Sequence, residues 1–140
     1  MSKVTMVSIL DKVEMIEAIM AEKPQVDIPV RHYFANGVYA REITIPAGVL
    51  LTGRIHKYEN LNILSEGEIS VLTENGMERF KAPAVIVSPP GTKRIALAHT
   101  RCVWTTILGT RETDPEKIEQ QFTVATSRHF DEFQRQLMGH

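Results

Sequence analysis

The chain has 140 residues, 43% of them hydrophobic and 24% charged, which is typical of a globular protein and excludes a chain too polar to fold. Its formal net charge of -1 excludes the basic surplus expected of a protein that binds a nucleic acid polymer. No apolar run approaches the roughly 20 residues needed to cross a bilayer, so we expect no membrane partner. The single cysteine, Cys102, has no partner for an internal disulfide, which is consistent with a cytoplasmic location.

The first predicted element is a helix in residues 1–24. Its apolar residues recur at helical spacing and share one face: Ile9, Val13, Ile16 and Met20. Pro24 ends this segment, because proline lacks the amide proton that continues a helix. We expect the helix to cover a barrel opening or a partner subunit.

Residues 25–110 consist of short extended runs separated by turn residues. The predicted strands are 38–45, 49–56, 61–64, 69–73, 84–88, 94–98 and 102–108. The sequence Glu74-Asn75-Gly76 is typical of a tight hairpin turn, and Pro89-Pro90-Gly91 ends another run. Short strands without helices between them predict an antiparallel barrel or sandwich rather than a parallel sheet.

Residues 111–140 are predicted to return to helix. Asp114-Pro115-Glu116 supplies a capping side chain, a proline at the first helical position and an acidic first turn. A second short helix follows Ser127, with apolar residues on one face at Phe130, Phe133 and Leu137. The length of the chain fits one domain over residues 1–140.

Two glycine- and proline-containing stretches carry a family resemblance. The first reads GVLLTGRIHKYENLNILSEG and resembles the first cupin motif, with Gly48, His56 and Gly67 at matching positions. Arg54 stands where that motif has its first histidine, and Asn60 stands where it has a glutamate. The chain therefore resembles the cupin superfamily, whose members are RmlC-like β-barrels.

The second motif of the family resembles the stretch that begins at Pro89. Pro89 and Gly91 match the Pro-x-Gly turn, while Arg94 occupies the place of the third histidine. The stretches VRHYFANGVYAREITIPAG, HKYENLNILSEG and PPGTKR are also similar to a small cupin-like group encoded by tailed bacteriophages. The resemblance implies a mostly β fold, an antiparallel cupin-type jelly-roll barrel with an N-terminal helix and C-terminal helices, assembled as a homo-oligomer.

The substitutions in these motifs bear on metal binding. Cupin enzymes hold a divalent metal with three imidazoles and a carboxylate, and of those four positions only His56 keeps a good ligand. Arginine is a permanent cation and an amide is a poor ligand for a transition metal. We therefore expect no metal cofactor. If a divalent metal does bind, His56 is the first candidate ligand, with His32, His99, Glu59 or Glu42 as further sources.

Strand alternation places the replaced residues on a common surface. Arg54 and His56 are two residues apart and point the same way, and so do Asn60 and Asn62 on the next strand. The cupin alignment implies that Arg94 also points inward. Buried guanidinium groups need a negative partner, which is either an internal carboxylate or an anionic ligand. The candidate internal partners are Glu42, Glu59 and Glu68.

The leading hypothesis is a non-catalytic protein that binds a small anionic molecule in the barrel. The candidate ligand-binding residues are Arg54, His56, Asn60, Asn62 and Arg94, and a nucleotide-like or sugar-phosphate-like ligand suits this set. If the chain is phage-encoded, it would sequester a small host nucleotide. Two alternatives stay open: a metal-dependent or metal-free cupin enzyme of the isomerase or oxygenase type, and a structural or assembly protein with an inert barrel. No catalytic residue can be assigned from the sequence.

Overall fold

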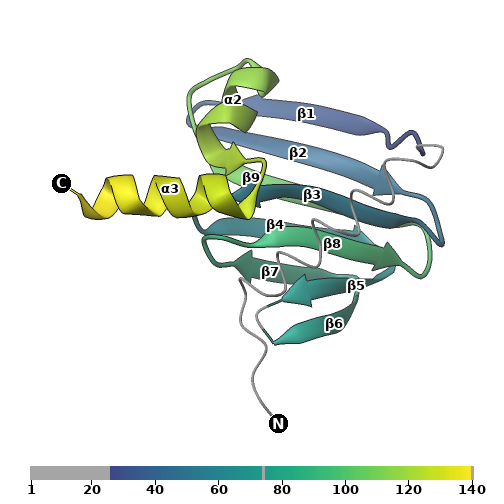
Figure 1. The fold of residues 1–140 in the computed structure, drawn as a ribbon. Helices are drawn as coiled ribbons and strands as arrows, with labels where there is room; N and C mark the ends of the chain where they lie inside the picture. Colours follow the sequence, from purple (N-terminus) through teal and green to yellow (C-terminus); the bar gives the residue numbers. More distant parts are fainter. Residues whose placement is uncertain (1–25, 74, 140) are drawn as a thin grey trace, which may run out of the picture.

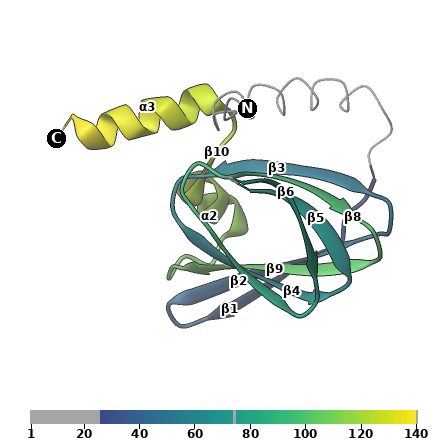
Figure 2. The same cartoon turned by 90° about the horizontal axis from the view of Figure 1, so that it is seen from below.

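The computed structural model describes residues 26–73 and 75–139, so the helix predicted in residues 1–24 lies outside the described residues. In this part of the chain, ten strands form two antiparallel sheets of five strands each. The two sheets face each other as layers (Figure 1), and helix α2 (Pro115–Phe122) lies at one end of them. The view from below shows helix α3 (Ser127–Met138) extending away from the layers (Figure 2).

Each sheet combines strands that are distant in the sequence. The first sheet has the order β1 (Val30–Ala35), β2 (Val38–Ile45), β9 (Cys102–Gly109), β4 (Asn60–Glu66) and β7 (Ala84–Ser88). The second has the order β10 (Thr123–Val124), β3 (Leu50–His56), β8 (Lys93–Ala98), β5 (Glu68–Thr73) and β6 (Gly76–Lys81). The expectation of an antiparallel, mostly β fold with C-terminal helices is thereby confirmed.

The seven predicted strands correspond to β2, β3, β4, β5, β7, β8 and β9, with small differences at their ends. Strands β1, β6 and β10 were not predicted as strands. Strands β1 and β6 are edge strands, and every residue of β1 is exposed. Strand β1 therefore lacks the alternation of buried and exposed residues on which the prediction depends, whereas β6 alternates between half-buried and exposed positions.

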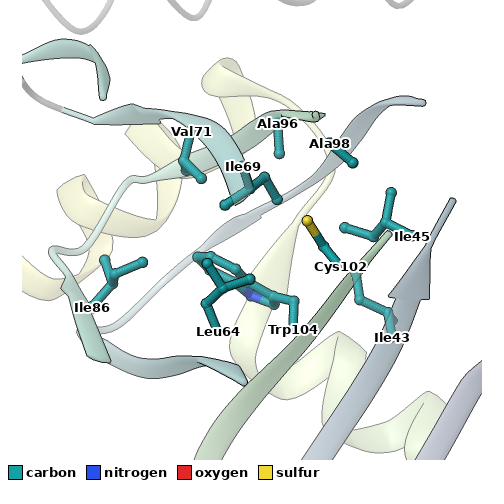
Figure 3. Close-up of a cluster of buried hydrophobic side chains, with 10 residues drawn as sticks. All are labelled: Ile43, Ile45, Leu64, Ile69, Val71, Ile86, Ala96, Ala98, Cys102 and Trp104. Carbon is teal, nitrogen blue, oxygen red and sulfur yellow. The ribbon is translucent and has the colours of Figure 1, made fainter. Parts of the chain in front are cut away.

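The core lies between the two layers and is made of alternate residues from both sheets. Figure 3 shows these side chains pointing toward one another: Ile43, Ile45, Leu64, Ile69, Val71, Ile86, Ala96, Ala98, Cys102 and Trp104. Cys102 is fully buried among them.

Both described helices begin with a side-chain cap. The Asp114 side chain accepts a hydrogen bond from the Glu116 backbone N–H at 3.0 Å, with Pro115 at the first position of α2 as predicted. The Thr126 hydroxyl accepts one from the His129 backbone N–H at 3.2 Å at the start of α3. No helix in the described ranges has the length and apolar character needed to span a bilayer.

Helix α3 is attached to the second sheet through its first turns. Phe130 packs in a buried cluster with Ile55 of β3, and Val124 and Phe133 complete this cluster. The contact lies on the outer side of β3, because Ile55 is completely buried there while its neighbours Arg54 and His56 line the space between the sheets.

Candidate functional site

A cavity of about 580 Å³ lies between the two sheets, on the side that α2 covers. Strands β2 and β9 of the first sheet and β3 and β8 of the second sheet contribute to its wall, as does α2. The polar side chains of the wall include Arg41, Arg54, His56, Arg94 and Thr106. The volume is in the range of small-molecule binding sites.

An irregularity in β3 directs Arg54 and His56 into this cavity. Thr52 pairs with Ile95 and Ile55 pairs with Lys93, so two residues of β3 lie opposite Arg94 alone. Such a β-bulge shifts the alternation by one residue, and bulges of this kind often lie beside functional sites. Beyond the bulge, Arg54 and His56 line the cavity together, as the sequence predicted.

The guanidinium of Arg94 is held by an aromatic ring and by a hydroxyl group. Its guanidinium carbon lies 4.8 Å from the centre of the Trp104 ring, and its Nη2 donates a hydrogen bond of 2.7 Å to the Ser88 hydroxyl. No carboxylate in the described ranges forms an ion pair with it. Burial of the charge lowers the pKa of Arg94 to about 10, which still leaves it protonated at neutral pH.

Asn60 and Asn62 lie behind Arg94 and are not part of the cavity wall. The Asn62 side chain donates hydrogen bonds to the Asn60 side-chain oxygen at 2.8 Å and to the Ser88 hydroxyl at 3.2 Å. Its own oxygen accepts a hydrogen bond of 2.7 Å from the Thr106 hydroxyl. Because Ser88 accepts from both Asn62 and Arg94, this buried network orients the guanidinium.

Arg54 has partners within the protein. Its Nε lies 3.1 Å from a carboxylate oxygen of Glu119 and donates to the Thr123 hydroxyl at 2.8 Å. The side chain is 41% exposed, so it was wrong to expect it to be buried like Arg94. The candidate partner Glu68 pairs with Arg79 instead, at 2.7 Å.

His56 lines the same cavity, and one nitrogen of its ring has no hydrogen-bond partner in the described residues. Within residues 26–73 and 75–139, its Nδ1 is the buried side-chain polar atom that has no hydrogen-bond partner. Burial, followed by the positive charges of Arg94 and Arg41, lowers the pKa of His56 to about 4. The imidazole is therefore neutral at neutral pH, and it can donate or accept a hydrogen bond.

The residues present do not fit the divalent metal that cupin enzymes hold. In the described part of the chain, no three His, Cys, Asp or Glu side chains are grouped so that they could hold a metal ion. Two of the alternative ligands have hydrogen-bond partners: His32 Nδ1 lies 2.6 Å from the Tyr39 hydroxyl, and His99 Nε2 lies 2.7 Å from the Ser70 hydroxyl. The Arg94 cation beside His56 repels a metal ion, and the single imidazole of His56 is too few ligands to offset that repulsion.

Several residues of the site were not predicted from the sequence, among them Ser88, Trp104 and Glu119. Ser88 is two residues from the core residue Ile86, so alternation along β7 could have placed it inside. Trp104 lies on β9, and its ring contacts Arg94. Glu119 carries no local signal, because its role depends on where α2 lies.

The comparisons with known proteins concern the fold. No protein-family model and no curated protein matches the sequence. The chain is similar to an RmlC-like cupin from Shewanella frigidimarina, with a TM-score of 0.51 and 18% identity over 63% of this chain and 87% of that one.

Two dioxygenases are also similar in structure. The acetylacetone dioxygenase from Acinetobacter johnsonii matches with a TM-score of 0.51 and 15% identity over 61% of both chains. The salicylate 1,2-dioxygenase from Pseudaminobacter salicylatoxidans matches with a TM-score of 0.53 and 12% identity over 71% of this chain and 32% of that one. The chain thus spans less than two thirds of either dioxygenase. At these identities the likeness concerns the fold alone, and it shows that this chain has the cupin, RmlC-like fold.

Proposed function

We propose that this protein binds a small anionic molecule in the cavity between its sheets, without catalysing a reaction on it. The observation that carries this proposal is Arg94. A largely buried guanidinium without a carboxylate partner in the described residues is costly for the folded state, and an anionic ligand removes that cost. The network through Ser88 and Asn62 holds the guanidinium in place before a ligand arrives.

The chemistry of the cavity supports binding over catalysis. Arg94 cannot exchange a proton near neutral pH, and a histidine with a pKa of about 4 is a weak general base there. The Tyr39 hydroxyl is bound to His32, and desolvation raises its pKa. The fold by itself leaves the choice of function open, since one fold serves many functions. In a phage, such a binder would sequester a host nucleotide or another anion.

Native mass spectrometry of the purified protein, with elemental analysis for metals, tests this proposal. We expect a metal-free protein that carries a small anionic mass, and we expect that mass to be absent from Arg94→Met. The control is Arg128→Gln, which changes an exposed arginine that pairs with Glu132 on α3. Near-stoichiometric metal would contradict the proposal and favour the enzyme. A protein that carries no anion and binds none when anions are added would favour the inert scaffold.

A further inference from the structure

The wall of the cavity has a polar part and an apolar part. Besides its charged and polar side chains, the wall has aliphatic side chains that belong to the core or pack against it: Ile43, Ile45, Leu51, Ile69 and Ala96. None of these side chains offers a hydrogen bond to a ligand. A hydroxyl group of a sugar or ribose placed against them would lose its hydrogen bonds to water without gaining new ones.

The charge of the wall is small. Three arginines line the cavity, namely Arg41, Arg54 and Arg94, and two glutamates oppose them, namely Glu116 and Glu119. Counted over these arginines and glutamates, the described wall carries one net positive charge. This balance fits a monoanion, whereas a phosphate dianion would also meet the two carboxylates on the α2 side.

The groups around the anion position suit a planar acid. Arginine binds a carboxylate in a bidentate manner, and Trp104 and Ser88 fix the orientation of the Arg94 guanidinium. The neutral imidazole of His56 lines the same cavity and supplies one further hydrogen-bonding group. Together these groups match the two oxygens of one carboxylate.

We propose that the ligand is a monocarboxylate with an apolar body, whose carboxylate binds Arg94 and His56 and whose body lies against the aliphatic wall. This proposal rests on the anion binding proposed above and specifies which class of anion binds. It disfavours the nucleotide-like and sugar-phosphate-like ligands that the sequence suggested. Burial of the body removes apolar surface from water and so strengthens binding.

Isothermal titration calorimetry with matched probes tests the ligand class. The probes are 4-phenylbutyrate and octanoate, the uncharged 4-phenylbutyramide, acetate, glucose 6-phosphate and adenosine monophosphate. We expect one of the two apolar carboxylates to bind at one per chain, the amide to bind at least about 10-fold more weakly, and acetate to give no detectable binding. We also expect both phosphates to bind more weakly than that carboxylate.

Variants assign the binding to the cavity. Arg94→Met should abolish carboxylate binding and Arg94→Lys should weaken it, because lysine keeps the charge but loses the bidentate geometry. Arg128→Gln should bind like the original protein. Circular dichroism establishes that each variant is folded, and Arg94→Lys keeps the test valid if Arg94→Met does not fold.

The outcomes separate the two proposals. If a phosphate binds more tightly than both apolar carboxylates and depends on Arg94, the ligand class is wrong while anion binding stands. If the amide binds as well as the acid, the carboxylate is not recognised and both proposals fail. The absence of binding by every probe to the folded protein also overturns both.

Discussion

At the scale of single residues, the two cavity arginines Arg94 and Arg54 differ in the groups that stabilise their charges. Arg54 lies at an exposed position with Glu119 beside it, so solvent and a carboxylate both stabilise its charge. Arg94 lies over the face of Trp104 and has the Ser88 hydroxyl as an acceptor, but no carboxylate among the described residues. Its charge therefore lowers the stability of the ligand-free protein and is available for binding.

We expect Arg94→Met to be at least as thermally stable as the original protein when no ligand is present. The substitution removes the cost of burying a charge, and the thioether of methionine can still pack against Trp104. Differential scanning calorimetry measures the melting temperature of both proteins. A melting temperature more than about 5 °C lower in the variant corresponds to a loss of more than about 1 kcal/mol in the free energy of unfolding. Such a result would show instead that the guanidinium stabilises the fold.

His56 makes stability depend on pH. Its pKa is 6.5 when unperturbed and about 4 in the folded protein, because burial, Arg94 and Arg41 all disfavour the imidazolium. Between these values the unfolded chain binds a proton that the folded protein does not, so stability falls as the pH falls. We expect a loss of up to about 3 kcal/mol in the free energy of unfolding between neutral pH and the lower value.

Urea unfolding of the original protein and of His56→Gln, measured across this pH range, tests this dependence. In His56→Gln the free energy of unfolding should fall much less as the pH is lowered. In His129→Gln, at an exposed position on α3, it should fall as in the original protein. If the free energy of unfolding changed equally with pH in all three proteins, a group other than His56 would cause the loss of stability.

At the scale of elements, α3 packs against the second sheet only through its N-terminal part. Its first turn buries Phe130 against Ile55, and the ring lies over Gly91. An added Cβ on Gly91 would approach the Phe130 ring to 2.8 Å, and the backbone there has a φ of +83°, so glycine is required for both reasons. Toward its C-terminus α3 becomes exposed, with Leu137 at 60% exposure.

We expect Phe130→Ala to lower the free energy of unfolding by about 3 kcal/mol, because it removes a buried ring and leaves a cavity against the sheet. Leu137→Ala on the same helix should change it by less than about 0.5 kcal/mol, since that side chain is largely in solvent. Urea unfolding at fixed pH compares the two variants. Similar losses for both would mean that the whole helix, and not only its first turn, is bound.

At the scale of the whole molecule, the outer face of the first sheet carries apolar side chains. Val85 and Val87 of β7 are 66% and 59% exposed, and Leu61, which pairs with Val87, is 37% exposed. Apolar patches of this kind are common at sites of protein association. The homo-oligomer expected from the sequence stays a prediction, and this face is the surface on which to test it.

We expect the original protein to be larger than a monomer in size-exclusion chromatography with light scattering. The double variant Val85→Lys and Val87→Lys should shift it toward the monomer, because association would bury two charges. Met77→Lys, at a position of 53% exposure on β6, is the matched control and should leave the size unchanged. A monomeric original protein would overturn the prediction.

The sequence by itself determined which segments form strands and helices, because alternation, turn residues and capping residues are local signals. Residues 38–45 and 84–88 alternate between buried and exposed positions and form strands with the predicted bounds. Asp114 and Pro115 likewise marked the start of α2. The cupin motif also placed Arg54, His56 and Arg94 around a common space, where the structure has its cavity.

Only the tertiary structure decided which of these polar groups is free to bind a ligand. Glu119 neutralises Arg54 because α2 lies beside β3, and Asn62 supports Arg94 from behind because Ser88 of β7 lies between them. Partners of this kind come from distant parts of the chain and depend on sheet order, on the bulge in β3 and on the position of a helix. Local periodicity carries no information on such contacts, because it reports which face a side chain shares and not what lies opposite that face.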